Sequence, residues 1–455
     1  MSTYIHLFES NSEYNEERES NYKEPWVSYT VQNEKVNYNK SEYEKLLGTP
    51  LTFEITSNGT INWVATYDGT EPGTLSRTIE YKKNNGEWTE VSATPNEYDE
   101  YEGTYKKEVL ITVSSGDTLQ FRGNNQGYSY YDEEEDGLYI WMFGAEAYFN
   151  IKGNIMSLID SNNFSTLNTL QSVETFNSLF SDNNGLTDAS NLILPATALT
   201  EWCYPYMFKG CSNLTKAPEL PATTLAEGCY YDMFENCTSL TRAPELPATT
   251  LANNCYQSMF NGCTSLSNVP ELPATTLAEG CYSQMFSNCT NLENGPSILP
   301  ATTLISRCYL SMFYECTSLT GVPELPATTL AEYCYQTMFY KCTSLTTAPE
   351  LPATSLVSSC YRQMFQDCTS LTTAPELPAT TLAESCYSYM FFNCTNLNYI
   401  KCLATSINAS SCTNYWVGGV QTNSGTFVKS PSITESTWGR GHDGIPNNWT
   451  VEDAS

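Results

Sequence analysis

Histidine is almost absent from this chain of 455 residues, which contains only His6 and His442. Neither lies near a recurring serine or cysteine in the sequence, so a histidine-activated nucleophile is not expected. The chain also lacks a phosphate-binding loop, a dinucleotide motif and the closely spaced cysteine pairs that bind zinc. We therefore expect no enzyme, no cofactor and no metal site. A glycosidase needs only two carboxylates, so the sequence leaves that class open.

Basic residues are also scarce. The chain has 21 lysines and arginines against 51 aspartates and glutamates, which gives a net charge of −30. Such a surface repels nucleic acid and anionic membranes. No apolar run is long enough to cross a bilayer, and the first ten residues lack the basic start and apolar run of a signal peptide. We expect no nucleic-acid partner, no membrane insertion and no export.

Cysteine is missing from the first 202 residues, and all eighteen cysteines lie between Cys203 and Cys412. Sixteen of them form eight Cys-x7-Cys pairs. If the intervening residues are helical, the two cysteines of a pair lie about 12 Å apart, beyond the reach of a disulfide. Buried free thiols are the favoured interpretation, and disulfides between repeats are the alternative.

What the chain has in abundance is one repeated unit of 26 residues, which recurs from about Leu194 to Asn398 with a single 27-residue spacing. A fixed period of this size indicates a solenoid or propeller, in which each unit buries its apolar side against its neighbours. A Leu-Pro pair begins at Leu194, Leu220, Leu246, Leu272, Leu299, Leu325, Leu351 and Leu377, and a Met-Phe pair at Met207, Met233, Met259, Met285, Met312, Met338, Met364 and Met390.

Each unit has two halves. Thr224 and Glu227 match a capping box, and Cys229, Met233 and Cys237 share one face of a helix, which predicts a helix from about Leu225 to Phe234. The second half holds two prolines and predicts an extended segment of three or four residues. Extended segments stack about 4.8 Å apart and helices about 8–10 Å apart, so we expect a curved solenoid.

The run Met/Ala-Phe-x-x-Cys-x-x-Leu followed by Leu-Pro resembles the BspA-like leucine-rich repeat. The resemblance covers about half of the chain and implies a binding or adhesion protein. Two features depart from the family pattern: the unit is longer, and Ala-Pro or Val-Pro stands where a β-branched strand residue is common. The layout as a whole also looks like that of proteins encoded by gut Bacteroidales and their crAss-like phages.

We divide the chain into four parts, which together predict a mixed α/β fold. Residues 1–48 form an aromatic anchoring arm, 49–154 an antiparallel β-sandwich, 155–400 the solenoid with its N-terminal cap, and 401–455 a C-terminal cap. Alternating residues predict sandwich strands at 51–55, 61–65, 78–81, 109–113, 118–121 and 147–151, with hairpin turns at Asn58-Gly59 and Asn84–Gly86. The acidic run 132–136 lacks calcium-loop spacing and is interpreted as a solvated loop, with calcium binding as the alternative.

Two surfaces of the repeats are candidate ligand-binding sites. The first is an acidic ridge: Glu219, Glu245, Glu271, Glu324, Glu350 and Glu376. The second is the pair of residues after each Cys-Tyr, which changes from copy to copy and from which we select Tyr231, Gln257, Gln284, Gln336, Arg362 and Tyr389. The alternative for the ridge is a turn residue that tolerates solvent, and the alternative for the variable pairs is neutral drift on an exposed surface.

In the arm, Phe8, Tyr14, Tyr22, Trp26 and Tyr29 are the predicted anchors, because a solvated acidic tail has no need of aromatic rings. The leading hypothesis is a non-enzymatic homo-oligomeric protein on a phage particle. It is held there by contacts of the arm with other virion proteins, and it binds a host-surface protein or glycan. The alternatives are a purely structural virion component and an interaction scaffold in the bacterial cytoplasm.

Overall fold

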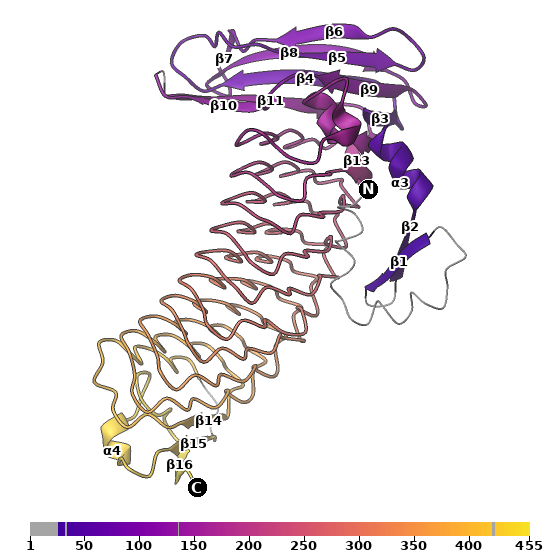
Figure 1. The fold of residues 1–455 in the computed structure, drawn as a ribbon. Coiled ribbons are helices and arrows are strands. Elements are labelled where there is room, and N and C mark those ends of the chain that lie inside the picture. The colour runs from indigo at the N-terminus through magenta and orange to yellow at the C-terminus, as the bar shows by residue number, and fades with distance from the viewer. Residues whose placement is uncertain (1–25, 32–33, 135, 421–423) are drawn as a thin grey trace.

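The computed structural model describes residues 26–31, 34–134, 136–420 and 424–455. Two β-sheets lie at one end of the molecule, the repeats are stacked below them in this view, and three short strands with a helical turn close the other end (Figure 1). Most of the described chain is strand and turn, with few helices. The expected mixed α/β class is therefore corrected to mostly β, because the repeats contribute no helix.

The N-terminal part contains two sheets that share one core. Phe143 of one sheet lies 5.0 Å from Phe53 and 4.8 Å from Phe121 of the other, measured between ring centroids. The first sheet has the strand order β10 (Ser129–Asp132), β11 (Gly137–Ala145), β4 (Gly59–Tyr67), β8 (Thr104–Val113), β7 (Glu97–Asp99). The second has the order β13 (Leu186–Ile193), β12 (Phe149–Asn154), β3 (Leu51–Ile55), β9 (Thr118–Gly123), β5 (Arg77–Lys83), β6 (Thr89–Ala93).

The two expected hairpin turns have different outcomes. Asn84–Gly86 does connect an antiparallel pair, β5 and β6, so that prediction is confirmed. The hairpin at Asn58-Gly59 is wrong, because β3 and β4 belong to different sheets and the turn carries the chain from one to the other. Only glycine fits there, since a Cβ on Gly59 would lie 2.8 Å from the backbone nitrogen of Ala147.

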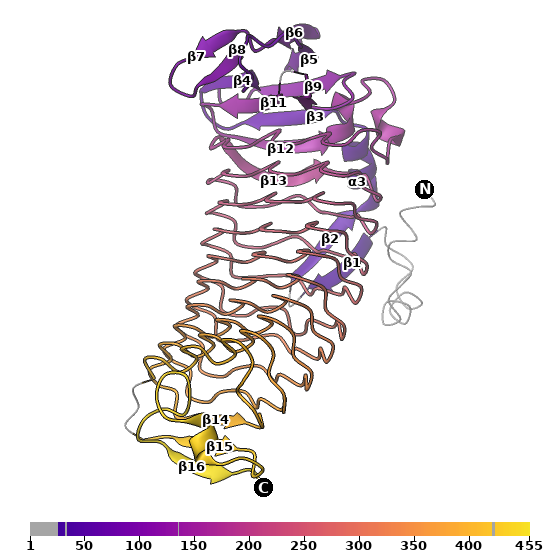
Figure 2. The same cartoon turned by 90° about the vertical axis from the view of Figure 1, so that its left-hand side faces the viewer.

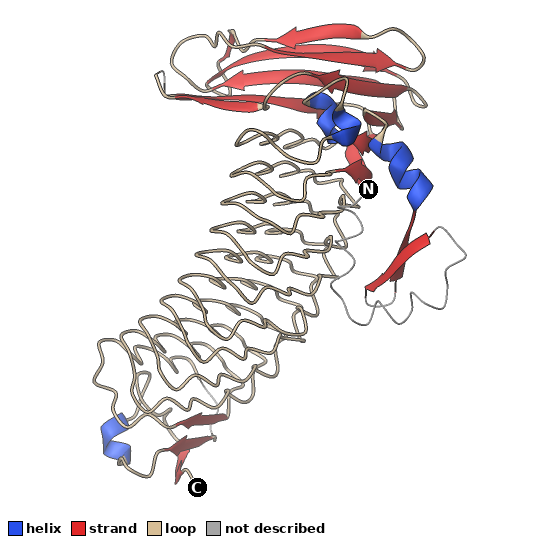
Figure 3. Ribbon diagram, in the orientation of Figure 1, coloured by secondary structure: helices blue, strands red, loops and turns tan. Residues whose placement is uncertain are grey.

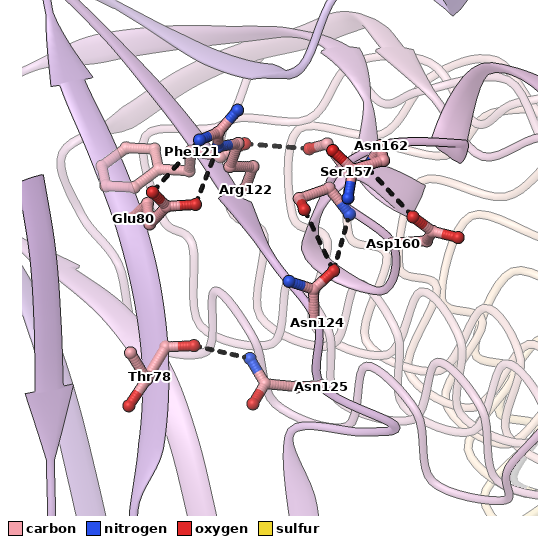
Figure 4. A network of polar contacts seen from close by, with 10 residues as sticks. Thr78, Glu80, Phe121, Arg122, Asn124, Asn125, Ser157, Asp160 and Asn162 are labelled. Atoms are coloured by element: carbon pink, nitrogen blue, oxygen red, sulfur yellow. Dashed lines mark hydrogen bonds and ion pairs between the residues drawn. The ribbon is translucent and has the colours of Figure 1, made fainter. Parts of the chain in front are cut away.

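A polar network ties the chain leaving the sheets back onto β9 (Figure 4). The 3-10 helix η1 (Ile155–Leu158) follows β12, and the Ser157 hydroxyl donates to the Phe121 carbonyl at 2.9 Å. Arg122 of β9 pairs with Glu80 of β5 at 2.8 Å. A second short helix, η2 (Phe164–Thr166), leads toward the repeats. The chain that follows β12 is thus held against β9 by a hydrogen bond as well as by chain continuity.

The arm contains a hairpin of β1 (Trp26–Val31) and β2 (Glu34–Asn39), followed by α3 (Lys40–Leu47), which contacts β12 and β13. Of the predicted anchors, Trp26 and Tyr29 lie in β1. Phe8, Tyr14 and Tyr22 lie outside the described residues. The anchoring role therefore stays a prediction.

Each repeat has a turn segment, residues 228–237 and their equivalents, where a helix was predicted. That prediction is wrong: the repeats contain turns only (Figure 3). Every fourth residue has a left-handed backbone, with φ of 58° at Gly228, 51° at Asp232 and 60° at Asn236. Left-handed residues break a right-handed helix, so Thr224 and Glu227 do not form the expected capping box.

Backbone hydrogen bonds explain why turns replace the helix. Successive N–H groups alternate between two kinds of acceptor: a carbonyl of the same segment and a carbonyl of the next repeat. Neighbouring copies therefore supply each other with the backbone hydrogen bonds that a helix would form internally. The N–H groups of Tyr231, Met233 and Glu235 donate to the carbonyls of Gly228, Tyr230 and Asp232 in their own segment, and those of Tyr230, Asp232 and Phe234 donate to the carbonyls of Cys255, Gln257 and Met259.

This pairing brings the repeats closer than packed helices. Ring centroids of Phe208 and Phe234 lie 5.3 Å apart, and those of Tyr230 and Tyr256 5.8 Å apart. Packed helices need about 8–10 Å between axes. We predicted curvature from a mismatch between closely stacked extended segments and more widely spaced helices. Because the repeats contain no helix, that mismatch is absent.

The proline half of each repeat is extended but carries only isolated parallel bridges, such as Arg242↔Asn268 and Thr250↔Thr276. The expected strands of three or four residues are wrong for these copies. Pro244 and Pro247 have no N–H to donate, so a continuous ladder cannot form.

The core of the stack consists of columns of identical side chains. Tyrosines from Tyr204 to Tyr387 and phenylalanines from Phe180 to Phe391 stack in register, and both columns end against Trp416. All eighteen cysteines are buried and free, as the thiol interpretation expected. In one cysteine column the thiol donates to a phenylalanine carbonyl of the preceding copy, as from Cys237 to Phe208 at 3.0 Å.

Both ends of the stack are covered. The degraded unit around Phe176 pairs with the first full repeat, and β13 joins β12 of the six-stranded sheet (Figure 2). At the other end β14 (Tyr399–Cys402), β15 (Thr426–Lys429) and β16 (Thr450–Asp453) form a parallel sheet beside α4 (Glu435–Trp438). These segments lie where the sequence predicted caps, and their role as caps stays a prediction.

Candidate binding surface

The turn segments set which side chains reach the surface. Cys229, Tyr230, Met233 and Phe234 belong to the core and are buried, and Tyr231, which lies between them, is partly exposed. At the positions of Tyr231 and Asp232 the chain varies from copy to copy. These positions therefore lie on a frame of constant backbone, which is how repeat proteins create a varied surface.

The variable positions are less exposed than a helix surface would make them. The first residue of each pair is half-buried in most copies, whereas the second has a left-handed backbone and is often buried. Of the residues that we selected, Gln284 is exposed, and Tyr231, Gln257, Gln336, Arg362 and Tyr389 are half-buried.

One hollow lies among these positions, with a volume of about 370 Å³. Gln257 is the one selected residue that lines it. The whole lining is Glu227, Asn253, Asn254, Gln257, Glu279, Gly280, Ser283, Arg307 and Leu310. Sequence reasoning missed Glu227 and Glu279 because it used them as helix caps. A usable signal was present in Arg307, since the equivalent residue is Gly228, Asn254 or Gly280 in the three copies directly before it.

Two of the charged groups in the hollow form an ion pair. Arg307 Nη1 lies 2.6 Å from Glu279 Oε1, and its guanidinium lies 5.3 Å from the ring centroid of Tyr333. The backbone N–H of Glu279 donates to the Asn253 amide oxygen at 3.2 Å. Glu227 has no positive partner in the lining, so the hollow carries two carboxylates and one guanidinium.

The acidic ridge is a column in the structure. Burial raises the pKa of Glu245, Arg242 lowers it, and the neighbouring Glu219 and Glu271 raise it further. Ile298 replaces glutamate in the copy between Glu271 and Glu324. Some members have partners: Glu271 accepts from the Ser297 hydroxyl at 2.8 Å, and Glu376 pairs with Lys401 at 2.9 Å.

Another charged cluster lies at the N-terminal end of the variable surface. Lys209 Nζ lies 2.6 Å from Glu235 and 3.7 Å from Asp232. Burial and the nearby Glu235 carboxylate raise the pKa of Asp232 to about 7, and Lys209 only partly opposes them. Asp232 thus holds a proton to an unusually high pH.

The histidines, thiols and metal-ligating groups of the described residues have the following environments. No group of three or more histidine, cysteine, aspartate or glutamate side chains within them could hold a metal ion. Burial raises the pKa of the thiols, to about 12 at Cys229 and Cys281, so reactive thiolates are scarce. His442 stacks on Tyr415, at 4.3 Å between ring centroids, and His6 lies outside the described residues. Within the described residues, no helix is long and apolar enough to span a membrane.

Comparison with known proteins identifies the repeats. Among curated proteins and among solved structures no significant match was found. The family model described as BspA type leucine rich repeat region matches residues 184–320 and 308–425 with six copies. The two matches together span more than half of the chain. It follows that this chain belongs to the BspA-type leucine-rich repeat family, whose repeats indicate protein binding or adhesion.

Proposed function

We propose that the chain is a non-enzymatic adhesion protein carried on a phage particle, where its repeats contact the host surface or its glycans. The observation that supports this best is the hollow among the variable positions of an adhesion-type repeat array. In this proposal the N-terminal sheets act as a β-sandwich stalk, and the repeats act as a solenoid that presents the variable surface.

Adhesion fits the constant and variable parts of each copy. The columns of tyrosine, phenylalanine and cysteine hold the backbone in register, while the pair of residues after each Cys-Tyr changes from copy to copy. A purely structural spacer would not need a varied outer side. The net charge of −30 favours solubility and works against binding to anionic polymers.

The first test is the location of the protein. Mass spectrometry of purified particles should detect the chain at a stoichiometric level. Its presence only in the cell lysate would favour the bacterial scaffold instead. The second test is binding of the full-length protein to host cells, with soluble glycans as competitors. A particle protein that binds no host cell would be a structural component.

The arm is the proposed attachment to other virion proteins or to further copies of this chain. A deletion of residues 1–39 removes the predicted anchors but keeps α3, which contacts β12 and β13. We expect this variant to stay folded and to bind host cells while failing to join particles. Normal incorporation of the deletion variant would place the anchor elsewhere, most simply in the two sheets.

A further inference from the structure

We propose that the hollow between Gln257 and Arg307 is a binding site for a neutral saccharide, an inference that rests on the proposed adhesion function and names its ligand class. Its volume of about 370 Å³ falls within the range of small-molecule sites. The hollow would then be the place on the variable surface where the saccharide binds.

The hollow arises from a local change in side-chain size. At the position of Ser283 the neighbouring copies carry Gln257 and Leu310, and at the position of Gly280 the next copy carries Arg307. Because equivalent residues stack at a nearly constant spacing, two small residues between larger ones leave a space. A Cβ on Gly280 would lie 2.4 Å from the amide oxygen of Asn254, so this glycine also permits close packing.

The lining matches hydroxyl groups. Carboxylates accept hydrogen bonds, amides both donate and accept, and a guanidinium donates. Together they suit a ligand rich in hydroxyl groups, because each hydroxyl both donates and accepts. The hollow offers Glu227 and Glu279 as acceptors, and Asn253, Asn254 and Gln257 as amides. Leu310 supplies an apolar wall for the carbon face of a sugar ring.

Charge selects a neutral ligand over an acidic one. Arg307 is already paired with Glu279 at 2.6 Å, which leaves Glu227 as an uncompensated negative charge in the lining. A uronate, sialate or phosphate would meet this carboxylate and the net charge of −30 of the whole chain. A neutral saccharide is repelled neither by this carboxylate nor by the net charge of the chain.

The test measures binding of the full-length protein to immobilised oligosaccharides. One set contains neutral hexoses and N-acetylhexosamines, and a matched set of equal length contains uronic acids. The wild-type protein should bind members of the neutral set. Ser283→Gln should lower that affinity at least tenfold, because it fills the hollow with a side chain that Gln257 shows the array accepts at this position. Glu227→Gln should lower it as well, through loss of an acceptor.

Matched controls separate the hollow from general effects. Ser388→Gln lies at the position equivalent to Ser283, and Glu332→Gln lies at the position equivalent to Glu227. Both make the same changes on other copies outside the lining and should keep wild-type affinity. Near-ultraviolet circular dichroism checks that all four variants are folded. No binding to the neutral set, tighter binding to the uronic acids, or unchanged affinity in Ser283→Gln would each overturn the proposal.

Host-cell binding measured in parallel distinguishes this inference from the proposed function. Wild-type adhesion that survives Ser283→Gln would leave the adhesion function standing and remove the hollow as its site. Saccharide binding that depends on Ser283 while host cells are not bound would support the hollow and contradict the adhesion role.

Discussion

At the scale of single residues, the buried thiols are built for packing rather than reactivity. They line the core in two columns, and burial raises their pKa, to about 12 at Cys229 and Cys334. Since the thiolate is the reactive form, we expect alkylation of the native protein to be slow. In denaturant without reductant, nearly all eighteen cysteines should react within minutes, as read by mass spectrometry. Thiols that stay hidden after denaturation would show disulfides instead.

Asp232 predicts a pH dependence with a defined sign. Burial raises its pKa in the folded protein to about 7, whereas the unfolded chain keeps a value near 3.8. Between these values the folded state binds a proton that the unfolded state does not, so stability from this group is present at low pH and lost as pH rises toward 7. Asp232→Asn should therefore melt higher than the wild type at pH 8, with the difference closing by pH 4.

The exposed Glu332→Gln removes one negative charge elsewhere and serves as the control for Asp232→Asn. Melting temperatures from pH 4 to pH 8 provide the comparison. A difference between wild type and Asp232→Asn that grows toward low pH would contradict the assignment.

At the scale of the element, a turn segment and a helix predict opposite effects of glycine and alanine substitutions on stability. Ser359 is buried with φ of 56°, at the position where two other copies carry Gly228 and Gly280. A left-handed backbone costs an L-residue about 1–2 kcal/mol, which glycine avoids. Ser359→Gly should therefore be at least as stable as Ser359→Ala in urea unfolding. In a helix, alanine would be ahead by about 1 kcal/mol.

The sequence could not distinguish these two structures. The spacing of Cys229, Met233 and Cys237 fits a helix face, and the same residues are buried by the turn segment. What separates the two is the partner of each N–H group. A helix keeps that partner four residues away, whereas the N–H of Tyr230 bonds to Cys255 in the next copy.

At the scale of the whole molecule, the stack depends on its ends. Trp416 is fully buried, contacts the last rings of both aromatic columns, and donates from its indole nitrogen to the Gly444 carbonyl at 2.7 Å. Trp416→Ala should lower the free energy of unfolding by roughly 3–5 kcal/mol, as expected for a large core residue. Equilibrium unfolding in guanidinium measures this.

The partly buried Trp88, over which Arg122 lies at 4.0 Å, is the control in the N-terminal sheets. Trp88→Ala should cost clearly less than Trp416→Ala. Equal losses would mean that Trp416 has no special role as the end of the columns.

Much of this molecule followed from the sequence alone: the period, the inward residues of each copy, the buried thiols, and strands such as Leu51–Ile55. These are determined locally, because burial follows from residue type and spacing. Tertiary structure alone decided that the turn segments bond across copies, that β3 and β4 part into different sheets, and that Ser283 and Gly280 leave a hollow beside Arg307. Each of these depends on which backbone or side chain arrives from a distant part of the chain, and local preference carries no information about that neighbour.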